Sequence, residues 1–355
     1  MTSYLMSNAL YYEDVSQSQE WNLPWERLRN KSVVLSGGTG LIGSFFVDVL
    51  MYLNRKMDLN ISVYVLCRNI ERAECRFGHC LNDPSLKFIE KDITQELDFD
   101  FPCDYALHLA SNTHPLAYSS DPIGTITTNV CGTKNMLDYA ASHGCERFLL
   151  ASSNEIYGEN RGDTEFFDEK YCGYIDCNTL RACYTESKRC SESLCNAYIA
   201  QKGLDCVIAR LTRTYGPTMR MDDSKAISQF IRNALNNESI VLKSDGSQFY
   251  SFSYVADAVQ GILTVLLKGQ RAQAYNIAAP SSDITLRELA YLVASICGVS
   301  VIFENPSDIE RAGFSAVTKA RLDPSKIKAL GWRCRYPIGK GIERTLKIMG
   351  ARIKC

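Results

Sequence analysis

A glycine-rich turn near the start of the chain restricts the possible folds more than any other feature. Gly37, Gly40 and Gly43 have the spacing G-x-x-G-x-x-G. The apolar run Ser32–Ser36 before them predicts a buried strand, and the run Leu41–Leu53 predicts a helix. Glycine is needed where a side chain would block a tight turn or the approach of a phosphate, and a helix start supplies unpaired N–H groups. The turn therefore predicts a strand–turn–helix unit that binds the diphosphate of a dinucleotide.

Further apolar runs predict strands, and helical runs alternate with them. Strands are expected at Ile61–Cys67, Leu86–Glu90, Tyr105–Leu109, Arg147–Ala151 and Asp205–Arg210, and long helices at Thr125–Ala141 and Tyr184–Gln201. This alternation indicates an α/β fold, a Rossmann-type doubly wound parallel sheet. In such folds ligands bind beyond the carboxyl ends of the strands, where the strand order reverses.

The pattern predicts three parts. Residues 1–30 are polar and aromatic and are expected to form an arm or short helix packed outside the core. Residues 31–210 are expected to form the dinucleotide-binding Rossmann domain. Residues 211–355 are expected to form mainly a smaller α+β substrate lobe, with returns to the first domain. Elements of this part are expected at Ala226–Asn236, Ile240–Lys243, Val255–Leu267 and Thr285–Cys297, the last with Thr285 as N-cap and Glu288 three residues later.

Composition argues against several classes of protein. The 39 basic and 40 acidic residues give a net charge of −1, which offers no basic field for nucleic acid. The 15 cysteines are odd in number and irregularly spaced, so we expect reduced thiols and no metal site. The first residues lack a signal-peptide pattern, and the run Ile262–Leu267 is too short to span a bilayer. We therefore expect a cytoplasmic protein without a membrane partner.

The residues after the second and third predicted strands bear on the choice of cofactor. An acid that binds the ribose 2′-hydroxyl of NAD is expected at the end of the second strand. Cys67 occupies that position, and Arg68 follows it. A guanidinium without a neighbouring carboxylate would suit the 2′-phosphate of NADP, so NAD and NADP both stay open. Asp92 and Ile93 follow the third strand, where they are expected to contact the adenine.

Three polar residues predict the chemistry. Tyr184 and Lys188 are four residues apart, so they share one face of the predicted helix. A cation near a phenol favours the phenolate, and Lys188 is therefore expected to lower the pKa of Tyr184. Lys188 could also hold the nicotinamide ribose. Ser153 follows the fifth strand, where its hydroxyl could bind the substrate oxygen. The three residues fit removal of a proton from an alcohol while a hydride leaves the same carbon.

Five motifs together resemble the extended short-chain dehydrogenase/reductase family, the nucleotide-sugar epimerases and dehydratases. They are the glycine turn, His108–Ser111, Asn129–Thr133, Ser152–Gly158 and Tyr184–Lys188, and the resemblance covers approximately residues 31–345. Within this family the chain is most similar to UDP-glucuronate decarboxylases. The stretches that carry this likeness are Ala110–Tyr118 with Asp121 and Pro122, Arg181–Tyr184 and Tyr215–Asp222.

The resemblance implies roles for individual residues. It implies that Glu155 acts beside the sugar with Ser153, Tyr184 and Lys188, because dehydratases and decarboxylases of the family carry glutamate there. It implies that Asn129 supports the backbone of the active site. The expected cofactor-binding residues are Gly37, Gly40, Leu41, Ile42, Gly43, Arg68, Asp92, Ile93, Leu109, Ala110, Ser111, Asn129, Tyr184 and Lys188. The expected substrate-binding residues are Ser111, Asn154, Arg213, Lys225 and Tyr250.

The chain departs from the family pattern at three positions. Asn154 replaces an aspartate that donates a proton in many dehydratases, which argues against simple 4,6-dehydration. Arg213 stands where the family usually has asparagine, and Tyr250 stands where it usually has arginine. Arg213 could replace the missing arginine as a clamp for the diphosphate. Alternatively, the pocket accepts a different sugar, alditol or phosphate arrangement.

The leading hypothesis is an enzyme that modifies a nucleotide-diphosphate sugar with tightly bound NAD or NADP. It would oxidise the C4 hydroxyl to a 4-keto intermediate, and decarboxylation, epimerisation or dehydration would follow, with decarboxylation favoured. One alternative is a net NADPH-dependent reductase of an activated keto-sugar or alditol precursor. Another is a non-catalytic dinucleotide sensor, although such proteins typically lose the tyrosine or lysine. The resemblance also implies a homodimer through Thr125–Ala141 and Tyr184–Gln201. The residues do not identify the nucleotide, the sugar or the product.

Overall fold

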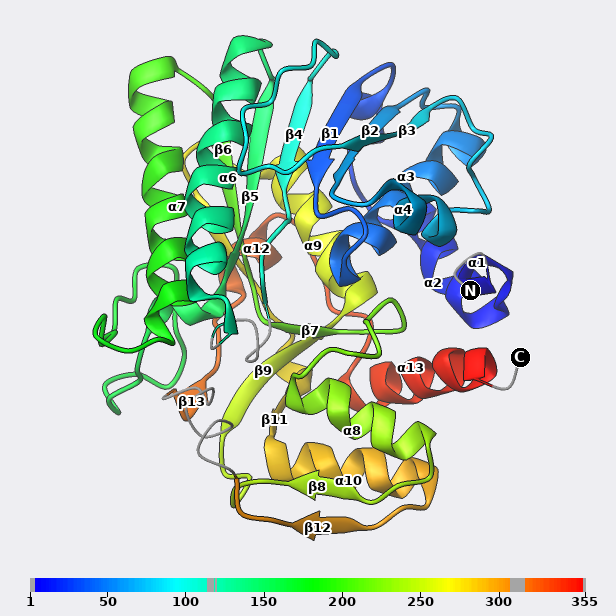
Figure 1. Cartoon of the computed structure of the whole chain (residues 1–355), viewed down its shortest axis with the longest axis vertical. Helices are drawn as coiled ribbons and strands as arrows, with labels where there is room; N and C mark the ends of the chain where they lie inside the picture. Colours follow the sequence, from blue (N-terminus) through cyan, green and yellow to red (C-terminus); the bar gives the residue numbers. More distant parts are fainter. Residues whose placement is uncertain (1–3, 114–117, 119, 307–316, 354–355) are drawn as a thin grey trace.

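A seven-stranded parallel sheet forms the centre of the larger domain in the computed structural model, which describes residues 4–113, 118, 120–306 and 317–353. The strand order is β10-β6-β5-β4-β1-β2-β3. Figure 1 labels the strands from β6 to β3. The strands are β1 (Ser32–Ser36), β2 (Ser62–Cys67), β3 (Leu86–Glu90), β4 (Tyr105–His108), β5 (Arg147–Ser153), β6 (Cys206–Leu211) and β10 (Ala274–Ile277). The strand order reverses between β1 and β4, so the predicted Rossmann-type fold is confirmed.

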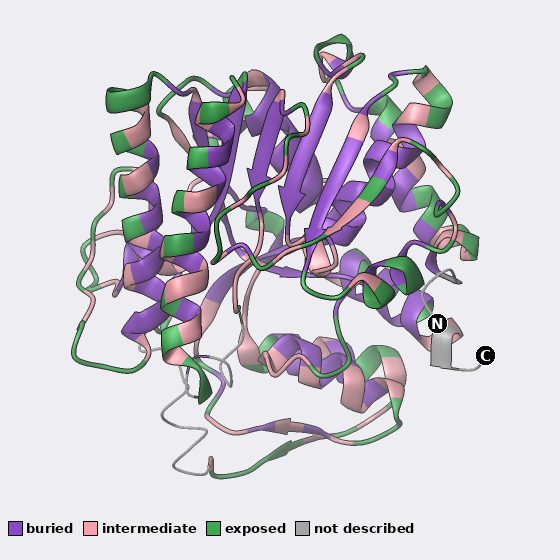
Figure 2. Cartoon of the chain, turned by 45° about the horizontal axis from the view of Figure 1, so that its top comes forward, coloured by how far each residue is buried: buried purple, intermediate pink, exposed green. Residues whose placement is uncertain are grey.

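Helices cover both faces of this sheet because its strands are apolar on both sides (Figure 2). Val33 and Leu35 of β1 pack in the core that contains α3 (Leu41–Met57) and α9 (Val255–Lys268). Val34 points the other way, into the core under α6 (Pro122–Ser142) and α7 (Ala182–Lys202). The larger domain therefore consists of three layers.

All six predicted strands exist, and their ends lie within two residues of the expected ones. The seventh strand, β10, was not predicted. It pairs with β6 in parallel, and α9 leads into it from the second half of the chain. This segment of the second half of the chain therefore joins the sheet of the larger domain.

A smaller lobe lies below the carboxyl ends of the central strands in Figure 1. Its first sheet contains β7 (Arg213–Tyr215), β9 (Phe249–Tyr254), β11 (Asp283–Thr285) and β13 (Lys319–Ala320), and its second contains β8 (Ile240–Leu242) and β12 (Val301–Phe303). Its helices are α8 (Ala226–Leu235), α10 (Leu286–Cys297) and α13 (Ile338–Ile353). The predicted N-cap of α10 is confirmed, since Thr285 and Glu288 form a reciprocal capping box.

The amino-terminal arm is part of the core, and the expectation that it packs outside was wrong. It forms α1 (Tyr4–Ser7), α2 (Ala9–Ser16) and two short 3-10 helices, Gln17–Glu20 and Trp25–Leu28. Tyr11 and Trp25 are buried in the main apolar core, where the ring of Tyr11 packs edge-on against Phe45 of α3. Burial of large aromatic side chains stabilises the folded state strongly, which explains why the arm is incorporated.

Two further short helices complete the fold. α4 (Ile70–Arg76) follows β2, and α12 (Ser325–Ala329) precedes α13. Within the described ranges, no helix combines the length and the apolar character that crossing a membrane would require. Residues 114–117 of the stretch Ala110–Tyr118 lie outside the described residues.

Candidate active site

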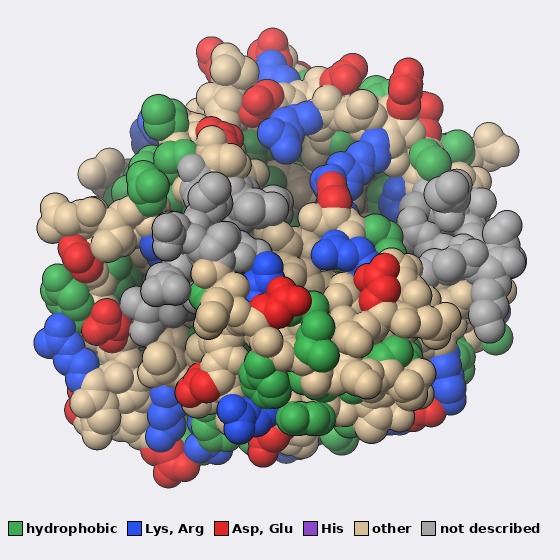
Figure 3. Space-filling model, turned by 60° about the horizontal axis from the view of Figure 1, so that its bottom comes forward, with side chains coloured by type: hydrophobic (Ala, Val, Ile, Leu, Met, Phe, Trp, Pro, Cys, Tyr) green, Lys and Arg blue, Asp and Glu red, His purple; other side chains and the backbone are tan. Residues whose placement is uncertain are grey.

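One cavity of about 660 Å³ lies between the carboxyl edge of the central sheet and the smaller lobe. Lys and Arg side chains gather around the hollow in this face, as Figure 3 shows. The basic residues that line the cavity are Arg68, Arg72, Lys91, Arg181, Lys188, Arg213, Arg220, Lys225 and Lys243. The cavity is therefore suited to a ligand with several negative charges.

Every residue predicted for the site lines this cavity, except Asn129. Asn129 lies behind the wall in α6, where it is fully buried. Its side chain accepts a hydrogen bond from Ser111 Oγ at 2.7 Å and donates one to Ser187 Oγ at 2.8 Å. Asn129 thus connects the loop after β4 to α7 without facing the ligand space.

The glycine turn provides space for a phosphate at the point where the strand order reverses. Gly37 has a φ of +75°, and a Cβ there would lie 2.6 Å from the backbone nitrogen of Ala110. A Cβ at Gly43 would lie 2.8 Å from the Cα of Gly38. Neither contact is possible, so both positions require glycine. α3 begins directly after Gly40, and its N–H groups face the same space. This arrangement fits the diphosphate of a dinucleotide.

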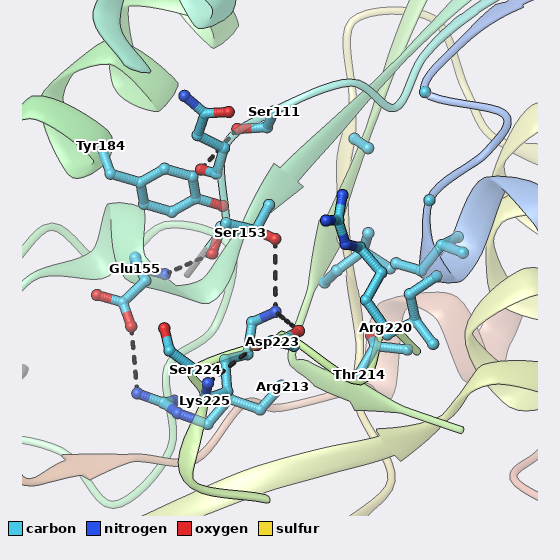
Figure 4. A pocket seen from close by; sticks show the side chains of 18 of the residues that line it. Ser111, Ser153, Glu155, Tyr184, Arg213, Thr214, Arg220, Asp223, Ser224 and Lys225 are labelled. Atoms are coloured by element: carbon cyan, nitrogen blue, oxygen red, sulfur yellow. Dashed lines mark hydrogen bonds and ion pairs between the residues drawn. The ribbon is translucent and has the colours of Figure 1, made fainter. Parts of the chain in front are cut away.

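Tyr184 and Ser153 meet at the carboxyl end of β5, where Figure 4 shows them side by side. Tyr184 is buried, and its ring packs 5.0 Å from the ring of Tyr118, centre to centre. Ser153 Oγ hydrogen-bonds to the phenol of Tyr184. The same oxygen accepts a hydrogen bond from the N–H of Glu155 at 3.2 Å. The two hydroxyl groups are therefore close enough to share one substrate oxygen.

The expected effect of Lys188 on Tyr184 is absent from this structure. Burial raises the pKa of Tyr184 to about 12, although the hydrogen bond from Ser153 partly opposes the change. Lys188 Nζ lies 6.0 Å from the centre of the Tyr184 ring and donates a hydrogen bond to the carbonyl of Ala151 at 2.9 Å. Burial also lowers the pKa of Lys188 to about 8. Desolvation thus outweighs the attraction between the two groups that their spacing suggests.

Glu155 lies between two arginines. Its carboxylate oxygens are 3.0 Å from Arg181 Nη2 and 3.1 Å from Arg213 Nη2. Burial opposes ionisation of Glu155, but the two guanidiniums outweigh it and lower the pKa of the carboxyl group. Nε and Nη1 of Arg181 and Nη1 of Arg213 are buried, and they have no hydrogen-bond partner among the described residues. Two cations and one anion give this part of the cavity a positive charge.

Arg213 and Lys225 are fixed by different contacts. The guanidinium of Arg213 stacks on the ring of Tyr250, and the hydroxyl of Tyr250 donates to the carbonyl of Val317 at 2.7 Å. Lys225 Nζ lies 2.9 Å from Asp223 and 3.4 Å from Thr113 Oγ1 (Figure 4). Arg213 therefore belongs to the group around Glu155, and Lys225 bridges the lobe and the loop after β4.

The cavity wall also contains residues that the sequence analysis did not name as site residues, among them Arg181, Tyr118, Arg72 and Arg220. Arg181 is three residues before Tyr184 and so lies one helical turn away, which was an available signal. Tyr118 stacks on Tyr184 and on the guanidinium of Arg181. Arg72 and Arg220 also line the cavity, and Arg72 is four residues after Arg68. Within the described ranges, no group of three or more His, Cys, Asp or Glu side chains could hold a metal ion.

The sequence matches the NAD dependent epimerase/dehydratase family over residues 33–278. The chain belongs to this family, and it is an enzyme with the Rossmann-type fold of the extended short-chain dehydrogenases/reductases. The predicted family is thus confirmed, and the family's name supports NAD-type cofactors in general.

Among curated relatives, the chain is similar to UDP-glucuronic acid decarboxylases. It is 34% identical to UDP-glucuronic acid decarboxylase 5 of Arabidopsis thaliana, over 88% of this chain and 87% of the relative. It is 32% identical to UDP-glucuronic acid decarboxylase 1 of Xenopus tropicalis, over 89% and 71%. A solved dTDP-glucose 4,6-dehydratase from Streptomyces venezuelae with NAD bound gives a TM-score of 0.78 at 26% identity, covering 91% of this chain and 98% of that chain.

Proposed function

We propose that this enzyme decarboxylates a nucleoside-diphosphate hexuronic acid through a 4-keto intermediate. The observation that carries the proposal is the arrangement of Glu155 between Arg181 and Arg213, in the cavity that also contains Tyr184. Two guanidiniums for one carboxylate leave a positive charge that a second carboxylate, on the substrate, would neutralise. The likeness to UDP-glucuronic acid decarboxylases supports the same choice.

The first step would remove two hydrogens from the C4 alcohol of the sugar, one from its oxygen and one from its carbon. Tyr184 takes the proton of the C4 hydroxyl, with Ser153 hydrogen-bonded to the same oxygen and Lys188 on the same helix face. Because burial raises the pKa of Tyr184 to about 12, Tyr184 must first lose its own proton, and the hydrogen bond from Ser153 favours that loss. A nicotinamide cofactor, when bound, would supply the chemistry of accepting and returning a hydride. The product is a β-keto acid, since the C6 carboxylate is then two carbons from the C4 ketone.

The second step would break the C5–C6 bond. Its electron pair moves toward the C4 oxygen to form an enolate, and C6 leaves as CO₂. Ser153 and the Tyr184 hydroxyl hydrogen-bond to the developing negative charge on that oxygen. A proton from solvent adds to C5, and return of the hydride to C4 together with return of the Tyr184 proton to the C4 oxygen gives a pentose with no net oxidation. This step needs no base at C5.

Glu155 is poorly suited to remove a proton from C5, which dehydration would require. This favours decarboxylation over dehydration. Its carboxylate is engaged by Arg181 and Arg213, and its pKa is lowered by them against the effect of burial. A carboxylate held by two cations has little tendency to take a proton from carbon. Asn154 also cannot donate a carboxyl proton. We therefore assign Glu155 a positioning role, in which it holds the two arginines toward the substrate.

The test is turnover of UDP-glucuronic acid, the substrate named in the relatives, by the purified enzyme. We expect release of CO₂ and of a nucleotide pentose in equal amounts. As a matched comparison, UDP-glucose has the same nucleotide and no carboxylate. If substitution of Arg213 weakened binding of both compounds equally, the assignment of the arginines to the carboxylate would be wrong.

A second candidate, net reduction of an activated keto-sugar by NADPH, is favoured by one observation. Arg68, Arg72 and Arg220 line the cavity near the end of β2, where a phosphorylated ribose would lie. A reductase consumes one NADPH per product, whereas a redox-neutral decarboxylase consumes none. Absorbance of the reduced nicotinamide during turnover distinguishes them.

We also propose a homodimer through α6 and α7, as the family resemblance implies. Apolar side chains at the amino-terminal end of α6 support this, because Ile123 is 75% exposed and Ile126 is 43% exposed. Light scattering of the purified enzyme tests it, and a monomer at all concentrations would contradict it.

A further inference from the structure

The end of β2 carries arginines where a ribose-binding acid is expected. β2 lies directly beside the glycine turn, since a Cβ at Gly38 would lie 2.5 Å from a side-chain carbon of Val65. The strand ends at Cys67, and Arg68 follows it. The side chain of Asn69 then caps α4 by accepting a hydrogen bond from the N–H of Arg72 at 2.7 Å. The cap places Arg68 and Arg72 at the start of one short helix, and both line the cavity.

A third arginine reaches the same region from the smaller lobe. Arg220 follows β7 and also lines the cavity, and Figure 4 shows its side chain among the residues that line it. Its Nε donates to Asp222 Oδ1 at 2.7 Å. Partial burial lowers the pKa of Arg72, and the guanidinium charges of Arg220 and Arg68 lower it further, while Asp222 opposes them. Three guanidiniums and one carboxylate thus influence the same part of the cavity.

Nearby carboxylates do not replace the missing acid. Glu74 and Glu90 lie close enough to the Cys67 thiol to raise its pKa together with burial, yet neither lines the cavity. Asp92 does line it, but its Oδ1 accepts hydrogen bonds from the backbone and hydroxyl of Thr94, both at 2.9 Å. The group that faces the ribose end from β2 is therefore a thiol followed by cations.

The carboxyl-terminal end of α4 is anchored in the protein, which holds the helix and Arg72 in place. Arg76 is one turn after Arg72, and its guanidinium pairs with the buried Asp48 of α3 at 2.5 Å. The hydroxyl of Tyr11 donates to the same carboxylate oxygen, also at 2.5 Å. The amino-terminal arm, α3 and α4 are thereby joined by one buried polar cluster. A helix fixed in this way can present a cation at a defined position.

We infer that Arg68, Arg72 and Arg220 bind a phosphate on the 2′-oxygen of the adenosine ribose, so that this enzyme takes NADP in preference to NAD. The inference rests on the proposed function only in assuming that the cavity binds a dinucleotide. It departs from the name of the family, which refers to NAD. Arginine binds phosphate through several parallel hydrogen bonds, and the loss of a carboxylate removes a repulsion.

The experiment measures binding of cofactor fragments by calorimetry, independently of turnover. The probes are 2′-phospho-ADP-ribose and ADP-ribose, which differ only in the phosphate. We expect the phosphorylated fragment to bind at least about tenfold more tightly. Arg72→Ala and Arg68→Ala should each remove most of this preference and leave the affinity for ADP-ribose nearly unchanged. Arg55→Ala, an arginine of α3 outside the cavity, is the matched control and should leave the preference intact.

Equal binding of the two fragments, or tighter binding of ADP-ribose, would overturn the inference. A preference that persists in both arginine variants would overturn the assignment of the residues. These outcomes differ from failure of the proposed function, which would appear as a lack of hexuronate turnover by an enzyme that binds either fragment. Cys67→Asp gives a further check, because a new carboxylate should shift the preference toward ADP-ribose.

Discussion

The guanidinium carbon of Arg213 lies 3.4 Å from the centre of the Tyr250 ring. These are the two positions at which the sequence resemblance implies an exchange of residues, and the structure places them in direct contact. Stacking on an aromatic face orients the guanidinium, and its Nη2 then reaches Glu155 at 3.1 Å. The exchange thus keeps one positive charge in the cavity but moves it to the group that contains Glu155 and Arg181.

Arg213→Ala should lower kcat/KM for the hexuronate by at least about tenfold, because a charged hydrogen bond contributes roughly 1.5–3 kcal/mol. Tyr250→Phe keeps the aromatic ring and should lower kcat/KM far less than Tyr250→Ala does. Steady-state kinetics measure all three variants. A double-mutant cycle between the two positions should give a coupling of about 1 kcal/mol, and additive effects would refute the contact.

Tyr184→Phe should reduce kcat by roughly 10²–10⁴-fold, the usual contribution of a positioned acid or base. Tyr198→Phe, on the same helix, is the control, because Tyr198 donates to Asp138 at the exposed side of α7. Single-turnover kinetics should show that hydride transfer itself is slowed. Full turnover by the Tyr184 variant would rule out its role as the base.

Glu155→Gln should destabilise the protein by about 3 kcal/mol, because it leaves two buried guanidiniums without a counter-charge. Denaturant unfolding measures this change. Kinetics should show a raised KM for the hexuronate, as expected of a positioning residue. In Glu155→Asp, which keeps the carboxylate, KM should rise less. If the glutamine variant instead lost only kcat at unchanged KM and stability, Glu155 would be acting directly on carbon.

Lys188→Met should change the dependence of stability on pH in the cofactor-free enzyme. The folded pKa of Lys188 is about 8, below the ordinary value of 10.5. Between these values the unfolded chain binds a proton that the folded chain does not, so stability contributed by Lys188 rises with pH. From pH 8 to 10.5, the free energy of unfolding of the wild type should therefore rise by on the order of 3 kcal/mol relative to that of the variant. Unfolding curves for both proteins across this range would show it, and parallel curves would contradict it.

Local patterns predicted elements on both sides of the cavity, because each depends on residues close in sequence. Gly37 and the strand before it are one example, and the capping box of Thr285 is another. β10 escaped prediction because a short strand is defined by its partner β6, more than 60 residues earlier. The arm was misplaced because its polar residues face partners such as Tyr254, which hydrogen-bonds to Asp14 from 240 positions away.

The ionisation states of the site residues depend on distances in the folded structure, which spacing along the sequence does not give. The interval between Tyr184 and Lys188 correctly placed both in one cavity, yet burial raises the pKa of the phenol. Glu155 was expected beside the sugar, and it lines the cavity, but its two arginine partners come from different elements. Desolvation and long-range ion pairs are properties of the assembled fold.

Mass spectrometry of the products formed from UDP-glucuronic acid labelled with ¹³C at C6 tests the central proposal most directly. We predict that all label appears in CO₂, that the nucleotide product is an unlabelled pentose, and that the cofactor ends in its starting redox state. A nucleotide product that retains the labelled carbon, or consumption of one reduced cofactor per product, would contradict it.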